Sequence, residues 1–238
     1  MNDSPPSAKT PLNPWTIWVP IIIAALGIVV FYNYLIYRSR IDNDVNRPPI
    51  YGRLEKDLEL TERSGKAVHL SDLKGKILVI SWVFTRCPRG CAAVIAKLKK
   101  LHEEFGNEPG LQFVSVTLDA DDTPEMMQKF ARGLGIKDDA NWWFVNGEKE
   151  AVRKFMTSQV QFRPVQDMPE ADRLSPDDKY MHDLRVAVID HRGHVRGLED
   201  ILNADPEAQK FWDEKIRKDL RYLLNEQKKS PYNPAAAN

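Results

Sequence analysis

The chain has 238 residues, and its 34 lysines and arginines are balanced by 34 aspartates and glutamates. Because the net charge is zero, there is no basic field to attract nucleic acid, and we expect no nucleic-acid partner. Only two cysteines are present, so a structural zinc site built on four cysteines is excluded.

An uncharged segment near the N-terminus indicates a membrane anchor. It extends from Thr10 to Tyr37 and is longer than the roughly 20 apolar residues that span a bilayer. Aromatic residues mark the two ends of the apolar run, as expected at membrane interfaces: Trp15, Trp18, Tyr32, Tyr34 and Tyr37. No small-x-small cleavage site follows the run, so we predict a polar N-terminal tail, 1–14, and an uncleaved transmembrane helix, 15–37.

The charges that flank this segment bear on its orientation. Arginines at positions 38, 40, 47 and 53 follow the span, whereas only Lys9 and the terminal amine precede it. Positive charge is retained on the cytoplasmic side of a membrane, so charge alone predicts that the C-terminal domain lies in the cytoplasm.

The rest of the chain divides into a polar linker, 38–54, one domain, 55–228, and a disordered tail, 229–238. Strands are expected within 58–70 (two, around a Ser-Gly turn) and at 77–84, 111–118, 141–145, 184–189 and 194–198. Helices are expected from just after Cys87 to 105 and at 123–133, 148–157 and 206–227, with an acidic loop at 159–179. This order of elements predicts an α/β fold, a thioredoxin-like three-layer sandwich.

The two cysteines, Cys87 and Cys91, lie where a buried strand gives way to a helix. A right-handed βαβ unit places Cys87 at the carboxyl end of a central strand, where α/β sheets usually carry their sites. Backbone N–H groups at a helix N-terminus favour thiolates, and the neighbouring Arg86 and Arg89 would favour them further.

The spacing of the pair leaves more than one chemistry open. Residues four apart share a helix face at roughly 6 Å between Cα atoms, which permits either a disulfide or a shared soft metal ion. A thioredoxin-type motif is one residue shorter, and Ala92 replaces the histidine that a c-type haem site needs. A stabilising disulfide and two buried free thiols are the remaining alternatives.

The segment from Val68 to Cys91 resembles the Sco/SenC copper-chaperone family, whose signature is Phe-Thr-x-Cys-Pro-x-x-Cys. The family also has an Asp near the end of the next strand, which matches Asp119. Its metal-binding His lies seven residues before the Ile of an Ile-Asp-x-x-Gly sequence, which matches His182. The chain departs from the family in having Ala92 in place of Pro, a shorter segment after Asp119 and a long acidic stretch before His182.

The resemblance implies one copper ion, Cu(I) or Cu(II), bound by Cys87, Cys91 and His182. It also implies that the two cysteines form a reversible disulfide. Three further residues are candidates to surround the ligands: Asp119, Arg86 and Met181. The other histidines are interpreted as structural, with His102 on a charged helix face and His194 facing outward: His69, His102, His191 and His194.

The function implied by the resemblance is delivery of copper to the copper A site of cytochrome c oxidase, or maintenance of that site's thiols. The expected partners are the oxidase subunit, the membrane and other copper carriers or thiol reductases. This role needs no enzymatic turnover and requires the domain to lie on the non-cytoplasmic side, against the charge bias. Two alternatives remain: a membrane-anchored thiol–disulfide oxidoreductase, and an accessory binding subunit of a respiratory complex.

Overall fold

The computed structural model describes residues 14–42 and 44–233, and it divides the chain into two units, residues 1–46 and 47–238. The first unit contains α1 (Trp15–Asp42), of which the part Trp15–Arg38 is long and apolar enough to cross a membrane. None of its apolar window is buried by protein, as suits a helix that contacts lipid. The helix continues past Tyr37, so the predicted linker begins with helical residues, and most of the predicted tail 1–14 lies outside the described residues.

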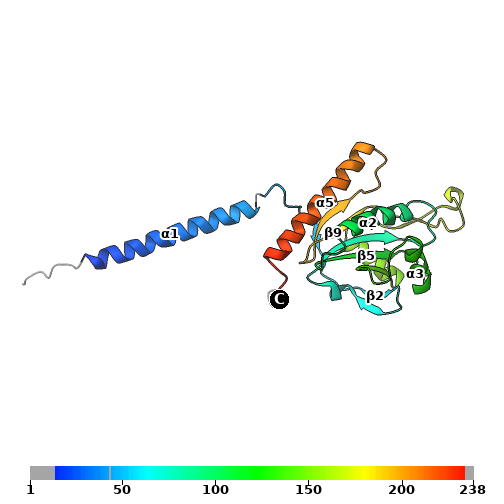
Figure 1. Ribbon diagram of the computed structural model, residues 1–238, viewed down its shortest axis with the longest axis horizontal. Helices are drawn as coiled ribbons and strands as arrows, with labels where there is room; N and C mark the ends of the chain where they lie inside the picture. The colour runs from blue at the N-terminus through cyan, green and yellow to red at the C-terminus, as the bar shows by residue number, and fades with distance from the viewer. Residues whose placement is uncertain (1–13, 43, 234–238) are drawn as a thin grey trace, which may run out of the picture. The chain divides into compact units, whose positions relative to one another are not determined.

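The second unit is built on an eight-stranded sheet with the order β1-β10-β9-β4-β5-β6-β2-β3 (Figure 1). Its strands are β1 (Gly52–Arg53), β2 (Glu59–Glu62), β3 (Ala67–His69), β4 (Ile77–Val83), β5 (Leu111–Thr117), β6 (Trp142–Asn146), β9 (Val186–Ile189) and β10 (His194–Glu199). The β4–β5 and β5–β6 pairs are parallel, whereas the other pairs are antiparallel. The helices are α2 (Cys91–Phe105), α3 (Pro124–Gly133), α4 (Lys149–Ser158) and α5 (Pro206–Lys229), with short 3₁₀ helices η1 (Leu70–Leu73) and η2 (Glu170–Asp172).

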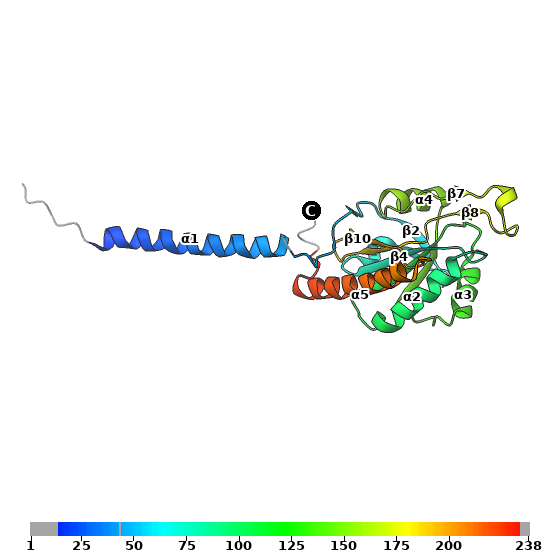
Figure 2. The same ribbon diagram turned by 90° about the horizontal axis from the view of Figure 1, so that it is seen from above.

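Central strand β4 is buried along its whole length and contributes to two apolar cores. Successive side chains of a strand point to opposite faces, so the two sets alternate. Ile77, Val79 and Val83 pack with α2, α3 and α5 on one face, and Leu78, Ile80 and Trp82 pack with α4 on the other. Figure 2 shows these two helix layers on opposite sides of the sheet. The predicted thioredoxin-like three-layer class is therefore confirmed.

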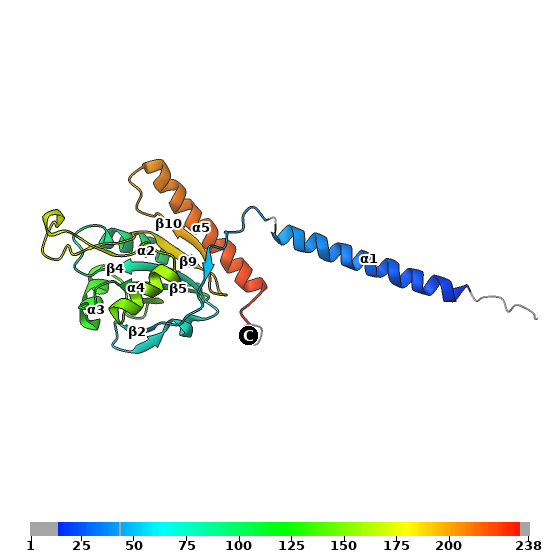
Figure 3. The same ribbon diagram turned by 180° about the vertical axis from the view of Figure 1, so that it is seen from behind.

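The acidic loop predicted at 159–179 contains more structure than expected. Strand β7 (Gln166–Asp167) pairs with β8 (Tyr180–Met181), and η2 lies between them. This hairpin, yellow in Figure 3, projects from the edge of the domain and leads directly into His182. Two paired positions are too few for a periodicity that sequence reading can detect.

The predicted polar linker and the predicted disordered tail also contact the domain. Gly52 and Arg53 form β1 against β10, and the buried Arg196 donates to the Pro48 carbonyl at 3.0 Å. At the other end, His191 donates through Nε2 to the Ser230 carbonyl at 2.8 Å. The first residues of the predicted disordered tail therefore contact the domain, and residues 234–238 lie outside the described residues.

Candidate metal centre

The loop after β4 positions both cysteines. Strand β4 ends at Val83, and the Cys87 N–H donates to the Phe84 carbonyl at 3.0 Å, so the chain turns immediately after the strand. Helix α2 then begins at Cys91. The Cys91 side chain is buried within the apolar core, whereas Cys87 is half-buried, and neither is in a disulfide. The thiol pair thus occupies the carboxyl end of a central strand, as the sequence predicts.

Folding brings His182 to this pair from a remote part of the chain. The imidazole Nε2 lies 3.2 Å from the Cys91 sulfur. The ligand atoms of Cys87, Cys91 and His182 all lie within 4.8 Å of one another, so one ion could contact all three.

The orientation of the His182 ring directs its Nε2 atom towards the two sulfurs. Its Nδ1 lies 2.9 Å from the backbone carbonyl of Asp183, and a carbonyl can only accept. Nδ1 therefore carries a proton, and Nε2 faces the sulfurs as the ring nitrogen left to bind a metal. A second hydrogen bond of this kind is how proteins orient a ligating histidine.

Asp183 fixes the backbone that makes this contact. Its buried carboxylate accepts from the Arg163 N–H at 3.0 Å and from the Arg185 N–H at 3.1 Å, and the Arg185 guanidinium also donates to it. These hydrogen bonds outweigh burial and hold the pKa of Asp183 below its ordinary value. Sequence reasoning missed this residue, although its position next to His182 was a usable signal.

The two thiols are electrostatically different. The Cys91 thiol stabilises the Cys87 thiolate most, and His182 and backbone N–H groups add to it, so the pKa of Cys87 is lowered despite partial burial. Donation to Cys87, together with desolvation, raises the pKa of Cys91. Cys87 is therefore the thiolate at neutral pH, and Cys91 keeps its proton until the thiol binds a metal ion or is oxidised.

The neighbouring arginines, expected to act on the thiols, are paired with carboxylates instead. Arg86 Nη2 lies 2.7 Å from the buried Asp119, which also accepts from the Asp121 N–H at 3.1 Å. Arg89 pairs with Asp178 at 2.7 Å. The lowered pKa of Cys87 is consequently due mostly to the Cys91 thiol and not to these two arginines.

A second buried carboxylate joins the two loops at this edge of the sheet. Asp122 accepts from the Thr85 N–H at 3.1 Å and from the Thr117 hydroxyl at 2.6 Å, and the Thr85 hydroxyl also donates to it. It thereby ties the turn after β4 to the end of β5. Sequence reasoning considered Asp119 and not Asp122.

Met181 lies beside the site. Its side chain is 47% exposed, and with His182 it lines an open cavity of about 410 Å³. The cavity also includes Arg163 and Asp183. Met181 and His182 therefore line the same cavity.

The remaining histidines lie outside the cluster. His69 contacts Asp57, and His194 contacts Asp190. His102 does not extend from a charged surface, because it bonds to Asn141 and packs against aromatic rings, while His191 is buried.

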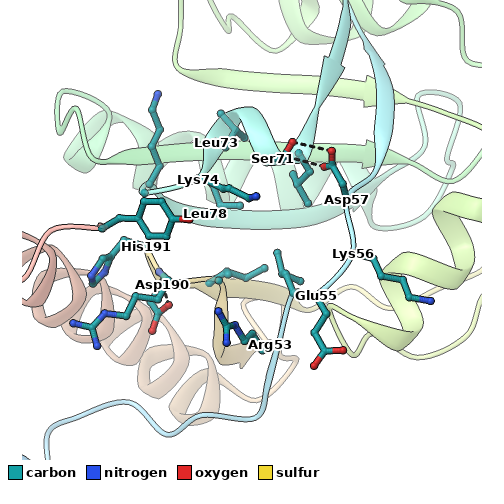
Figure 4. Close-up of a pocket in the computed structure, with 18 residues that line it drawn as sticks. Arg53, Glu55, Lys56, Asp57, Ser71, Leu73, Lys74, Leu78, Asp190 and His191 are labelled. Carbon is teal, nitrogen blue, oxygen red and sulfur yellow. Dashed lines mark hydrogen bonds between the residues drawn. The ribbon is translucent and has the colours of Figure 1, made fainter. Parts of the chain in front are cut away.

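A separate cavity of about 410 Å³ lies at the opposite end of β4 (Figure 4). Buried apolar side chains, Leu73 and Leu78 among them, line it together with Lys74, His191 and other polar residues. It contains none of the three clustered ligand residues.

The SCO1/SenC family model matches residues 50–215. The SCO1 protein homolog of Bacillus subtilis (strain 168) is 25% identical over 136 residues, which cover 56% of this chain and 66% of that relative, just under two thirds of its length.

Solved structures extend the comparison to the fold. A SCO1/SenC family lipoprotein from Bacillus anthracis str. Ames is 27% identical with a TM-score of 0.57, and the match covers 72% of this chain and 98% of that one. Yeast Sco1 with copper bound is 18% identical with a TM-score of 0.54, over 78% of this chain and 99% of that one. At that identity the likeness is one of fold.

Proposed function

Since the chain belongs to the SCO1/SenC family, we propose that it is a membrane-anchored copper chaperone that binds one copper ion through Cys87, Cys91 and His182. The observation that carries the proposal is the convergence of two sulfurs and one imidazole nitrogen within 4.8 Å. Two thiolates and an imidazole make a soft donor set suited to Cu(I), and an added ligand adapts it to Cu(II). Yeast Sco1, whose fold the domain shares, is described with copper bound.

The redox state of the cysteines should control this binding. Metal ligation needs deprotonated thiols, so only the dithiol form takes Cu(I), and oxidation to a Cys87–Cys91 disulfide prevents uptake. Cys87 is half-buried and its pKa is lowered, so it is the sulfur able to attack or to be attacked first. Copper binding and thiol exchange thereby become mutually exclusive states of one site.

The acceptor we propose is the copper A site of a cytochrome c oxidase subunit, on the non-cytoplasmic side of the membrane. This follows from the family's role rather than from flanking charge. A half-buried ligand such as Cys87 lets an ion leave by ligand exchange. The apolar helix α1 would confine the search to the membrane plane, where effective concentrations are high.

A Cu(I) competition titration of the full-length reduced protein in detergent tests the ligand set. We expect one Cu(I) per chain, and loss of at least about 100-fold in affinity for His182→Ala, because losing a ligand should exceed the 10–100-fold effect of losing a residue that supports one. His69→Ala is the matched control, since His69 lies in β3 and contacts Asp57. Equal affinity of His182→Ala and wild type would refute the three-ligand site.

A second candidate function, thiol–disulfide oxidoreductase, is favoured by the asymmetry between the Cys87 thiolate and the protonated Cys91. Deleting the gene and measuring oxidase activity separates the two functions. Loss that added copper restores supports delivery, and loss that only a thiol reductant restores supports reduction. An unchanged oxidase with its copper intact would exclude both roles.

A reporter fused to the C-terminus, active only in the cytoplasm, tests the proposed orientation and should stay inactive.

A further inference from the structure

The loop between the two cysteines is tied to the hairpin that carries His182. The guanidinium of Arg89 lies against the Asp178 carboxylate, with Nε 2.9 Å from Oδ1 and 2.8 Å from Oδ2. Its Nη2 is 2.7 Å from the same carboxylate and donates to the Asp172 carbonyl at 2.8 Å. Arg89 stands midway between Cys87 and Cys91, and Asp178 stands four residues before His182. One ion pair therefore joins the two parts of the candidate metal centre.

Asp178 depends on this contact. Its side chain is only 2% exposed, and its other hydrogen bond comes from the Leu174 N–H at 2.8 Å. Without Arg89 this buried carboxylate would keep only the Leu174 N–H and the more distant charge of Arg173, which is costly unless the segment opens to water. Nearby, Arg86 also approaches the exposed Asp177 at 3.5 Å, which adds a weaker contact between the same two segments.

The rest of the hairpin is held mainly at its base, where Arg153 also lies 5.0 Å from the centre of the Tyr180 ring. Strands β7 and β8 share two paired positions, and Leu174 near the tip is 69% exposed. At the base, Tyr180 packs edge-to-face on Phe84 with ring centroids 5.8 Å apart, and Met168 is buried. The base is thus fixed by packing, whereas the segment around Asp178 is fixed by charge.

We propose that Arg89 and Asp178 form a latch that positions His182 against the two thiols, and that this latch raises the affinity of the site for copper. The inference rests on the proposed copper function. The Arg89 guanidinium contacts Asp178 and the Asp172 carbonyl, and only the Arg89 backbone N–H faces the Cys87 sulfur, so the side chain is a positioning group and not a ligand. With the latch closed, the imidazole is already placed before the metal arrives, so binding does not have to order the hairpin.

The test compares Arg89→Ala with the charge-exchanged pair Arg89→Asp/Asp178→Arg in the full-length protein. Arg132→Ala is the control, because Arg132 on α3 also forms an ion pair, with the exposed Asp138, outside the clustered ligands. We expect Arg89→Ala to weaken Cu(I) binding by about 10-fold to 100-fold, the usual effect of removing a residue that supports a ligand. The exchanged pair should recover part of that loss, and Arg132→Ala should show none.

Two further readouts separate positioning from general destabilisation. Hydrogen exchange of the metal-free, reduced protein should rise within residues 166–182 in Arg89→Ala and stay unchanged in helix α2. The nitrogen splitting in the electron paramagnetic resonance spectrum of the Cu(II) form should weaken. In the His182→Ala background, Arg89→Ala should cause no further loss of affinity. Unchanged exchange and affinity in Arg89→Ala, or an equal loss in the His182→Ala background, would overturn the latch.

Failure of the proposed copper function and failure of the latch give different results. A wild-type protein that binds no Cu(I), in which Arg89→Ala still raises hydrogen exchange in 166–182, would refute the copper function and the latch's role in affinity while retaining its structural part. A wild-type protein that binds Cu(I) through His182, with exchange and affinity unaltered in Arg89→Ala, would retain the copper function and refute the latch.

Discussion

The two parts of the candidate metal centre are held in place in different ways. The thiol loop runs from a fully buried strand into a 15-residue helix, so the backbone itself limits where Cys87 and Cys91 can lie. The His182 segment follows a hairpin with two paired positions and is held largely by side-chain contacts. The sulfur pair is therefore the rigid part of the site, and the imidazole is the part whose placement can be lost by single substitutions elsewhere.

The largest effect should come from the rigid part. Cys91→Ser removes a sulfur from within the apolar core and leaves a hydroxyl that ligates Cu(I) poorly. We expect loss of Cu(I) binding by more than about 100-fold, which exceeds the effect of residues that only support ligands. Competition titration measures it, with Ser64→Ala on a surface turn as the control. Retained binding would show that Cys91 is not a ligand.

Asp183→Asn tests the His182 side of the comparison. The amide keeps the shape but not the charge, so the contacts to Arg163 N–H and the Arg185 guanidinium weaken, and the His182 ring loses its fixed carbonyl. Affinity for Cu(I) should fall by about 10-fold. Alkylation of Cys87 at pH 6 in the metal-free protein should change little, because the Cys91 thiol contributes most to lowering its pKa, and a large change would mean that His182 contributes more than we infer.

The thiols should differ in how they respond to pH. Because the pKa of Cys87 is lowered to about 3, iodoacetamide should modify Cys87 at pH 6, where an ordinary thiol is almost fully protonated, while Cys91 stays unmodified. Mass spectrometry of the reduced, metal-free protein at several pH values measures it. Equal labelling of both cysteines, or labelling that begins only near pH 8, would contradict the assigned asymmetry.

The same shifts predict the pH dependence of stability in the metal-free, reduced protein. A folded-state pKa below the unfolded value means that the Cys87 contribution is full above the ordinary thiol pKa and declines as pH falls towards about 3. The raised pKa of Cys91 acts in the opposite sense, and its contribution is lost as pH rises above the ordinary thiol value. Replacing Cys87 with Ser should flatten the acidic side of the profile measured by denaturant unfolding.

The smallest effect should come from the apolar contact between the thiol loop and the residues after His182. A Cβ added at Gly90 would lie 2.9 Å from the Cδ1 atom of Leu184, two residues after His182. The Leu184 side chain can turn aside, so Gly90→Ala should weaken Cu(I) binding by only about two-fold to five-fold. Gly133→Ala, where a Cβ meets nothing within 4 Å, is the control. A loss as large as that of Asp183→Asn would show that the gap between loop and hairpin is tighter than we infer.

The sequence by itself determined those features of the protein that are set by residues close together in the chain. The uncharged run from Thr10 to Tyr37 predicted a membrane-spanning helix, and apolar periodicity predicted the strand and helix on either side of the cysteine motif. The position of Cys87 at the end of a central strand followed from the same local pattern. These features are determined locally, because hydrophobic period and helix N-termini are properties of consecutive residues.

Only the tertiary structure decided which distant residues meet. No local pattern brings His182 to the thiols, and only the family resemblance pointed to it. The pairing of Arg86 with Asp119 and of Arg89 with Asp178 was likewise not visible, so the arginines were expected to act on the thiols. Side-chain partners far apart in the chain are chosen by the packing of the whole sheet and its loops. For that reason the position of the sulfur pair could be predicted from the sequence, whereas the Arg89–Asp178 contact and the hydrogen bonds of Asp183 could not.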